Sequence, residues 1–388
     1  MRVVLVALSL LISAFSVGTD LFRPAAESSL CRLGFCRFDQ IFASIDARGM
    51  RPANVAALVN EDPANPLVWC AYGDVLAQTG NTAEATRAFD HAMTLGPHMP
   101  PVLMRGVNFY VGYGQPEKIL PLSAKILTQT WTFDQIIFPY FKMANLPTRE
   151  LLGVAVPTEA RAARAWLDWV RVNGSDADLT ETWEWMTKNR LLDQPSAVNA
   201  IWALWSRKSY RTAHALWLDW LGPGHIDKAA DGSERLVNRA FEKEPAGGPF
   251  DWTLYAPASV TLTRRDGLEV RFSGRENVAF SGVSQAVEVR PGPYRFTADI
   301  EANGLTTDQH PFFHIFDPAN PGAVHAESQP IQNGATPSRI AVDISVPPST
   351  QVLLVQLERR PSERFDNKIE GTVRVHDVSL RAIGRGGQ

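Results

Sequence analysis

The spacing of hydrophobic residues changes once along this chain, and that change limits what the chain can fold into. Before about Gly222 the apolar residues recur at helical spacing, and after about Gly247 they alternate as they do in strands. Ten of the eleven Trp residues precede Asp251, whereas the later part carries short Val, Ile and Phe runs separated by Pro and Gly. A chain of 388 residues has room for two or three domains. The sequence therefore predicts an α-helical region followed by a β region.

One stretch of the helical region has the spacing of a two-helix repeat. Gly73 and Ala85 would let two antiparallel helices approach, and Gly80 would make the turn between them. Pro97 would end the second helix. The whole set resembles a tetratricopeptide repeat. Its members are Pro66, Trp69, Tyr72, Gly73, Leu76, Gly80, Ala85, Phe89, Ala92 and Pro97.

A second unit follows in the same phase but is less regular. Tyr110 and Gly114 fit it, whereas Ile119 and Ser123 stand where the repeat usually has Ala and an aromatic residue. One such unit cannot bury its own apolar face, so neighbouring helices must exist. We expect them at residues 38–59 and 133–143, with a further helix pair at residues 194–221.

Pairs of tryptophans three residues apart recur in this region. Trp166 and Trp169 share one helical stripe, as do Trp217 and Trp220. Such a stripe would suit a row of stacking platforms for a polysaccharide, or it would form core. Large aromatic residues at helical spacing usually pack inside, so we expect core.

Eight strands are expected in the C-terminal part, with turn residues between them. Ile340, Val342 and Ile344 show the alternation most clearly, because they share one face of a strand. Eight strands of this length suit a two-sheet jelly roll. The expected strands are residues 258–262, 268–272, 282–289, 294–302, 312–316, 338–346, 351–359 and 372–381.

Both ends of this β region resemble the carbohydrate-binding-module type of jelly roll. Asn238, Phe241 and Glu242 match that family's "N-x-x-F-E" opening strand, and residues 375–380 are similar to its final strand. Residues 282–296 resemble its "Q-x-V-x-V-x-P-G-x-Y" hairpin. The resemblance implies a sandwich that binds a ligand, since domains of this type seldom catalyse.

A narrower resemblance covers the β region well and the helical region loosely. Residues 248–252, 277–280, 304–309 and 359–371 are similar to segments of bacterial proteins that join tetratricopeptide-type helices to such a sandwich. Members occur among genes for exopolysaccharide assembly and export. The resemblance implies a setting and no established activity.

Four segments follow from these patterns. Residues 1–18 are a signal peptide or membrane anchor, and residues 19–222 are a tetratricopeptide-like helical domain. The Gly- and Pro-containing stretch at residues 223–235 is a linker. Residues 236–384 are a carbohydrate-binding-like antiparallel β-sandwich.

The resemblance also implies a structural calcium ion, which would be the only cofactor. The family's ligands fall on Glu242 and Asp377 in this sequence. Calcium takes about six to eight oxygen ligands, so backbone carbonyls and water would have to complete the site. His376 stands where the family commonly has a second acid, and a pair of solvated acids at strand ends is an equally weighted interpretation.

Polar residues of the loops are the candidate ligand-binding groups. Trp252 would offer a stacking face, and the charged side chains would bond to sugar hydroxyls. A structural network in which Arg359 or Arg360 pairs with Asp251 or Asp366 is the slightly favoured alternative. The candidates are Asp251, Trp252, Arg359, Arg360, Asp366, Asn367 and Lys368.

Catalytic and metal sites receive little support from the sequence. His310 and His314 lie near Asp317, but no third ligand is evident, so a metal site there is disfavoured. No phosphate loop, nucleophile elbow or Cys/His dyad spacing occurs, and no carboxylate pair is singled out. We therefore expect a protein that is not an enzyme.

The N-terminus predicts export. Arg2 precedes an apolar run from Val3 to Val17, which is short for a membrane span of about 20 residues and typical of a secretory signal peptide. Cleavage before Thr19 would release the protein, most simply into a bacterial periplasm, whereas an uncleaved segment would anchor it.

The cysteines agree with an oxidising compartment. Cys31 and Cys36 are close enough in sequence to form a disulfide in a short loop. Cys70 lies on an apolar helical face and is expected to be a small buried residue. Three cysteines without paired Cys/His spacing do not make a zinc site.

The charge balance argues against two kinds of partner. The formal net charge is −3 with both signs mixed, which does not favour a nucleic-acid surface or a polybasic membrane patch. We expect the helices to recruit a protein partner and the sandwich to bind or guide an exopolysaccharide. A purely protein-binding scaffold of an export complex and a polysaccharide-modifying enzyme are the alternatives.

Overall fold

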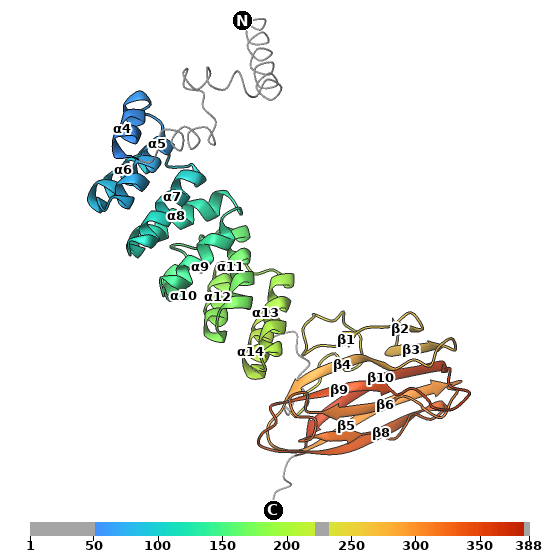
Figure 1. The fold of residues 1–388 in the computed structure, drawn as a ribbon. Helices are drawn as coiled ribbons and strands as arrows, with labels where there is room; N and C mark the ends of the chain where they lie inside the picture. Colours follow the sequence, from blue (N-terminus) through green and yellow to red (C-terminus); the bar gives the residue numbers. More distant parts are fainter. Residues whose placement is uncertain (1–50, 222–232, 384–388) are drawn as a thin grey trace, which may run out of the picture. The chain divides into compact units, whose positions relative to one another are not determined.

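A computed structural model describes residues 51–221 and 233–383, with helices in the first range and strands in the second (Figure 1). This order confirms the predicted fold class. The chain forms two compact units, of which the first ends at Trp166 and the second begins at Leu167. Among the described residues, no helix has both the length and the apolar character needed to cross a bilayer.

The helices follow one another with short connections. They are α4 (Pro52–Glu61), α5 (Pro66–Gln78), α6 (Thr82–Leu95), α7 (Pro100–Gly112), α8 (Pro116–Gln129), α9 (Asp134–Met143), α10 (Thr148–Leu151), α11 (Ala160–Asn173), α12 (Asp176–Lys188), α13 (Gln194–Ser206) and α14 (Tyr210–Leu221). Within this series α5 packs on α6, α7 on α8, and α13 on α14.

The α5–α6 hairpin confirms the predicted tetratricopeptide-like unit. A Cβ atom on Gly73 would lie 2.8 Å from the ring of Phe89, so only glycine permits this approach. Gly80 has a φ of +83° in the turn between the helices, a region that favours glycine. Asn65 caps α5 by accepting a hydrogen bond from the backbone N–H of Leu67 at 3.0 Å.

The α7–α8 hairpin shows how the irregular second unit still packs. Ile119 and Ser123 are both buried, so these residues fill the space that Ala and an aromatic residue usually occupy. Phe89 of α6 stacks on Phe109 of α7 with ring centroids 4.5 Å apart, which joins the two hairpins.

The tryptophan stripes are only partly core. Trp166 and Trp217 are buried as predicted, and Trp183 is buried with its indole N–H donating to Asp219 at 2.7 Å. Trp202, in contrast, is 37% exposed, and Trp131, before α9, is 73% exposed. The core interpretation is therefore confirmed for Trp166 and Trp217, whereas Trp169 and Trp220 of the same stripes are half-buried. It is wrong for Trp202, and it did not include Trp131.

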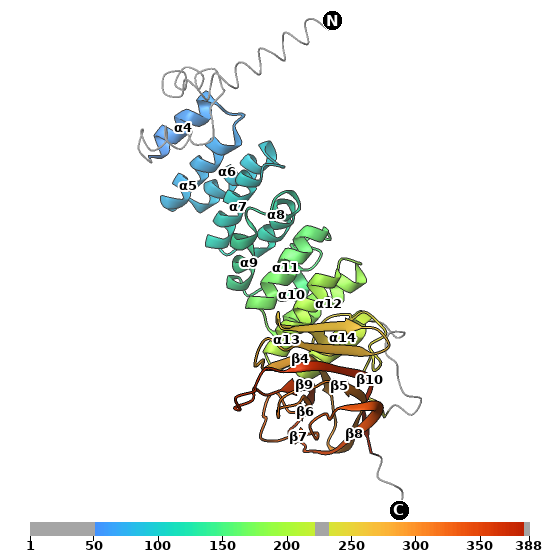
Figure 2. The same cartoon turned by 90° about the vertical axis from the view of Figure 1, so that its right-hand side faces the viewer.

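The strands form two antiparallel five-stranded sheets, which pack as the two layers of a sandwich (Figures 1 and 2). One has the order β1-β4-β9-β6-β7 and the other β2-β3-β10-β5-β8. The strands are β1 (Thr253–Leu254), β2 (Val260–Arg264), β3 (Leu268–Ser273), β4 (Phe280–Glu288), β5 (Gly292–Asn303), β6 (Phe312–Phe316), β7 (His325–Glu327), β8 (Gly334–Val346), β9 (Val352–Arg359) and β10 (Glu370–Ala382).

Inward-facing residues of both sheets form one core. Phe296 of β5 packs against Phe313 of β6 with ring centroids 4.9 Å apart, and Phe272 of β3 packs against Phe280 of β4 at 5.8 Å. All eight predicted strands are present. β1 and β7 are additional, and with two and three residues they are too short to show an alternating pattern.

The sandwich closes on itself at its ends. The backbone N–H of Arg235 donates to Leu380 at 2.9 Å, and that of Ala382 donates to Ser233 at 3.2 Å. Residues 233–235 are therefore paired with the last strand. The rest of the predicted linker, residues 223–232, lies outside the described residues.

Helix α14 packs on the sandwich through an aromatic cluster. Phe250 lies with its ring centroid 4.9 Å from His214 and 5.9 Å from Trp217, and Trp217 donates from Nε1 to the carbonyl of Gly247 at 3.2 Å. His214 Nδ1 lies 3.0 Å from Glu288 Oε2 on β4. A cavity of about 300 Å³ lies beside this contact. These contacts explain why the second compact unit contains helices as well as the sandwich.

His214 makes this contact sensitive to acid. Burial lowers the pKa of His214, and the positive charge of Arg235 lowers it further, while Glu288 opposes the shift. Because the folded-state pKa lies below the unfolded value of about 6.5, His214 contributes stability above that pH. The contribution is lost as pH falls through the folded-state pKa.

We therefore expect the stability difference between the wild type and His214→Phe to shrink as pH falls below about 6.5. The measurement is the free energy of unfolding in urea for both proteins, from pH 8 to 5. His98→Phe is the control, because His98 is exposed. A difference that stays constant over this range, or grows at low pH, would contradict the assignment.

Candidate functional site

Two of the predicted ligand-binding residues lie inside the molecule. Trp252 is 2% exposed, its ring lies 4.6 Å from that of Phe241, and its Nε1 donates to the carbonyl of Asn238 at 3.0 Å. Asp251 is also buried and accepts from the backbone N–H groups of Ala246 and Trp252, both at 2.7 Å. Burial raises the pKa of Asp251. The stacking face predicted for Trp252 is thus turned into the core.

Arg359 is buried as well, and its guanidinium forms hydrogen bonds with several loops. Its Nε donates to Gln309 O at 3.1 Å, and its Nη2 to Asn367 O at 3.2 Å. Its Nη1 donates to Asn277 Oδ1 at 3.0 Å and to the carbonyl of Val278. Arg359 therefore has a structural role, but its partners are not the carboxylates of Asp251 or Asp366 with which the alternative interpretation paired it.

The other loop candidates are separated. Asp366 and Lys368 are exposed on the loop before β10, where the carbonyl of Lys368 accepts from Thr306 Oγ1 at 3.1 Å. Arg360 lies elsewhere, on the outward face of the β9–β6–β7 part of the sheet. Of the seven candidates, the structure joins Asp251 to Trp252 and Arg359 to Asn367 by hydrogen bonds.

The predicted calcium ligands have other surroundings. Asp377 accepts a hydrogen bond from Arg239 Nη2, so a guanidinium already balances its charge. Glu242 is exposed. Calcium at these positions stays a prediction.

The cysteine predictions divide between the described and the other residues. Cys31 and Cys36 lie outside the described residues, so their disulfide stays a prediction. Cys70 is fully buried, as expected, and burial raises the pKa of its thiol to about 12.

A polar row crosses four strands of one sheet. Strand register pairs Ser284 of β4 with Gln356 of β9, Gln356 with His314 of β6, and His314 with Glu327 of β7. Because β6 and β9 bury the residues that alternate with these, the row faces outward. Donors and acceptors are thereby aligned across the sheet.

Apolar and charged side chains border this row. On one side lie Leu354 and Phe316, which are paired in register and half-buried, and Phe316 stacks on His314 with ring centroids 4.3 Å apart. On the other side Arg360 lies over the ring of Phe312, 4.6 Å from its centroid. An aromatic side chain beside aligned hydrogen-bonding groups is the usual composition of a site for a polar ring compound.

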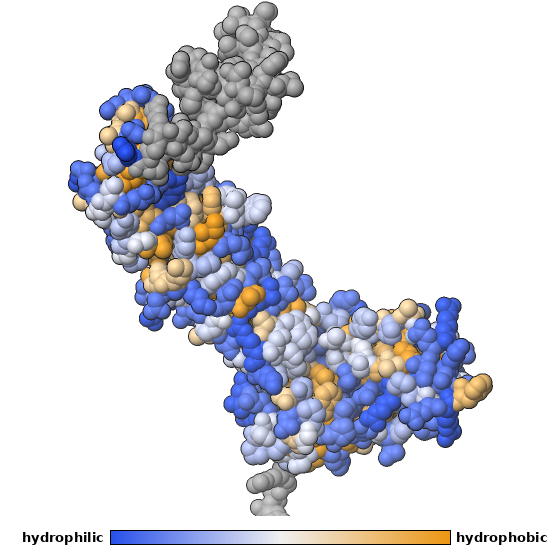
Figure 3. Space-filling view, in the orientation of Figure 1, coloured by the Kyte–Doolittle hydropathy of each residue, from blue (hydrophilic) through white to orange (hydrophobic). Residues whose placement is uncertain are grey.

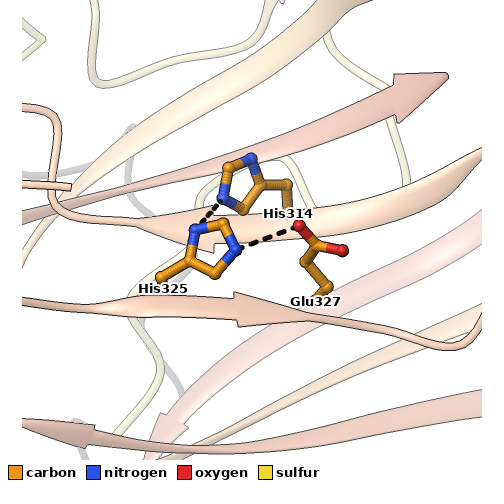
Figure 4. A group of neighbouring side chains, drawn as sticks. All are labelled: His314, His325 and Glu327. Atoms are coloured by element: carbon orange, nitrogen blue, oxygen red, sulfur yellow. Dashed lines mark hydrogen bonds and ion pairs between the residues drawn. The ribbon is translucent and has the colours of Figure 1, made fainter. Parts of the chain in front are cut away.

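Titratable groups on this face form a chain of contacts. His314 Nδ1 lies 2.8 Å from Glu358 Oε2, and its Nε2 lies 3.0 Å from His325 Nδ1. His325 Nε2 lies 3.0 Å from Glu327 Oε1. Figure 4 shows the imidazole of His325 between His314 and Glu327. Arg360 also pairs with Glu327, and this hydrogen bond lowers the pKa of the Glu327 carboxyl.

The sequence pattern grouped His314 with His310 and Asp317, and the structure separates these three residues. His310 bonds through Nδ1 to the carbonyl of Ile331 at 2.7 Å, and Asp317 is buried and accepts from Thr350 Oγ1 at 2.8 Å. Only His314 of that group reaches the cluster. His325 and Glu327 lie on β7, and their spacing of two residues, which places them on one face of a strand, was the available signal.

Comparisons with known proteins give partial matches only. No protein-family model matches the chain, and no curated protein matches it. The enzymatically active domain of bacteriophage CBA120 tailspike protein 4 matches at 19% identity and a TM-score of 0.28, over 40% of this chain and 22% of that one.

Two further solved structures resemble different parts of the chain. Clostridium thermocellum xylanase 10B, with its CBM22-1 and GH10 modules, matches at 13% identity and a TM-score of 0.27, over 40% of this chain and 30% of that one. Pseudomonas aeruginosa pilF matches at 14% identity and a TM-score of 0.24, over 53% of this chain and 95% of that one. The chain thus spans less than two thirds of the tailspike and xylanase structures. At these identities and TM-scores, the matches carry no inference about function.

Proposed function

We propose that this is an exported, non-catalytic binding protein, in which the helical repeats hold a protein partner and the β-sandwich binds an exopolysaccharide during its assembly or export. The supporting observation is the outward polar row of Ser284, Gln356, His314 and Glu327, with Phe316 beside it. Sugar hydroxyls bond to donors and acceptors placed around the ring, and a half-exposed aromatic side chain offers a surface for the apolar face of a sugar.

The same face supports a role without catalysis. Glycoside hydrolysis needs one carboxylic acid whose pKa is raised, so that it can protonate the leaving oxygen. The Arg360 hydrogen bond instead lowers the pKa of Glu327. Glu358 lies 3.5 Å from Arg360 Nε, so both carboxylates share one guanidinium as a charge partner. A carboxylate whose pKa is lowered, as that of Glu327 is, accepts hydrogen bonds well and is a poor general acid.

The helical repeats offer a surface for a protein partner. Trp131 is 73% exposed, and on the neighbouring helix α9 Met143 is 72% and Ile136 41% exposed. Ile136 and Met143 are seven residues apart and so share one face of α9, and exposed large apolar side chains of this kind often mark a protein interface. The space-filling view shows apolar patches among the polar surface of the helices (Figure 3). The exported location rests on the apolar run at residues 3–17, which lies outside the described residues.

We expect the full chain to be retained by at least one bacterial exopolysaccharide in affinity electrophoresis. Phe316→Ala should weaken retention about 10-fold or more, because it removes the aromatic surface, and Gln356→Ala should weaken it as well. Phe365→Ala is the matched control, because Phe365 is a fully exposed aromatic residue on the loop between β9 and β10 and is not a member of this row.

The other outcomes separate the alternatives. A folded protein that no polysaccharide retains would favour the purely protein-binding scaffold. Shortening of the polymer during incubation, measured by size-exclusion chromatography, would favour an enzyme. Equal loss of retention in Phe365→Ala and Phe316→Ala would move the site away from this face.

A further inference from the structure

The side chains of Glu358, His314, His325 and Glu327 make three successive contacts. If both histidines are neutral, they have hydrogens for only two of these contacts. Each contact joins two nitrogen or oxygen atoms at 2.8–3.0 Å, so each needs a hydrogen between them. A neutral imidazole carries a single N–H, and an ionised carboxylate carries none. Two neutral histidines therefore supply two hydrogens for three contacts. The third contact therefore needs one additional positive charge, either a proton or a metal cation.

The tautomers of the two histidines decide which of the three contacts lacks a hydrogen. In the tautomer in which His314 donates from Nδ1 to Glu358, the lone pair of His314 Nε2 is directed at His325. A carboxylate on the remote ring nitrogen is the usual arrangement behind a metal-bound histidine, because it fixes the tautomer and makes the ligand more basic. Glu358 thus prepares His314 to donate its lone pair outward.

We propose that His314, His325 and Glu327 bind a zinc ion, for which Glu358 is the supporting carboxylate. One ligand atom from each of the three side chains lies within 4.8 Å of the other two. Zinc–nitrogen bonds of about 2.0–2.1 Å place the ligands of a tetrahedron about 3.3 Å apart, so small side-chain rotations close the site. The side chain of His325 is 53% exposed and has room to rotate.

The donor set selects the class of ion. Two imidazoles and one carboxylate suit zinc and its neighbours among the transition metals, whereas calcium and magnesium prefer all-oxygen sites. With neutral imidazoles, the carboxylates of Glu327 and Glu358 and the guanidinium of Arg360 sum to one negative charge, which favours a divalent cation. Arg360 holds Glu327 Oε1, so the other carboxylate oxygen is the zinc ligand.

A zinc ion at this position would have two effects. β7 is a three-residue strand at the edge of its sheet, paired only with β6 in the register of the described strands, and zinc would tie β7 to β6. Three protein ligands leave a fourth position open to solvent, where a ligand oxygen can bind. The inference does not rest on polysaccharide binding, since zinc uptake is measured without any glycan.

The test is a zinc titration of the full chain at pH 7.5, in competition with a chromophoric chelator. Cys31→Ser and Cys36→Ser are included throughout so that free thiols do not take up metal. We expect one ion per chain, with a dissociation constant in the micromolar range or tighter. His325→Ala and Glu327→Gln should each weaken binding about 100-fold, and Glu358→Gln about 10-fold.

Three controls distinguish zinc bound at this cluster from zinc bound elsewhere. His98→Ala removes an exposed histidine from the helical region and should leave zinc affinity unchanged. Cobalt should give visible absorption bands of a low-coordinate site, and His325→Ala should abolish them. Lowering the pH from 7.5 to 5.5 should release the metal, because protons compete for both imidazoles. Each variant is first shown to keep the wild-type unfolding midpoint in the presence of chelator.

Two results would overturn the proposal. In one, the folded chain takes up no zinc, so that a proton supplies the additional charge. In the other, zinc binds with equal affinity to the wild type, His325→Ala and Glu327→Gln, so that the metal lies elsewhere.

Discussion

Replacing Arg359 by Met is expected to lower the free energy of unfolding by about 3–5 kcal/mol, among the largest effects of any single substitution in the sandwich. The guanidinium is 1% exposed and donates to the carbonyls of Gln309 and Val278 and to the side chain of Asn277. A methionine fills similar space but leaves these acceptors without donors inside the protein. The loops they belong to would lose their common partner.

Urea denaturation of the full chain measures this loss. Arg359→Lys should recover only part of it, because an ammonium group cannot reach acceptors on several loops at once. Arg295→Met is the matched control, since Arg295 is exposed and its pairing with Asp343 is on the surface. A loss below about 1 kcal/mol in Arg359→Met would show that the loops hold their positions without it.

The second large effect is expected at Glu234, where Ala should cost about 3 kcal/mol or more. Its side chain is 1% exposed. It accepts from the backbone N–H groups of Leu236 at 3.1 Å and Leu380 at 2.9 Å, and from Arg381 Nε at 3.3 Å. One carboxylate thus satisfies donors from both ends of the sandwich, and alanine leaves them unpaired.

Glu234→Gln separates charge from hydrogen bonding at this position. It keeps an acceptor for the backbone donors and should cost less than Glu234→Ala, as measured by the same urea unfolding. Glu242→Ala is the control, because Glu242 is an exposed carboxylate nearby in sequence. If Glu234→Ala and Glu242→Ala unfold at the same urea concentration, the carboxylate contributes nothing to closure. Adding calcium to the Glu242→Ala experiment also tests the predicted calcium site.

Long periodic segments made most of the fold predictable. The glycine and alanine positions of the α5–α6 unit follow from how closely two helices must approach, and the clash of a Gly73 Cβ with Phe89 shows the same constraint in space. β1 and β7 were missed because two or three residues carry no period. Their positions depend on pairing with β4 and β6, which no local pattern records.

The site was harder to predict than the fold, because charged residues such as Arg359 were expected at the surface. Arg359 lies in phase with Leu353, Val355 and Leu357, all of which are buried. Its alternation therefore placed it on the inward face, and that signal was present in the sequence. Trp252 gave no such signal, since Phe250 and Asp251 beside it are buried as well.

The histidine cluster depends on strand register. His314 and His325 are eleven residues apart and meet because β6 and β7 pair with His314 opposite Glu327. Glu358 arrives from β9, 44 residues after His314 in the chain. Strand register cannot be read from the sequence, where these residues are polar positions far apart from one another.

The paired ends of the sandwich also bear on how such a chain can be assembled from parts. Ser233 and Ala382 are hydrogen-bonded neighbours, so the polypeptide enters and leaves the sandwich at one place. A module with adjacent ends can be inserted into a surface loop of another protein without stretching either, and its old ends can be joined and new ones cut elsewhere. Recombination can therefore move this sandwich between proteins as a single cassette.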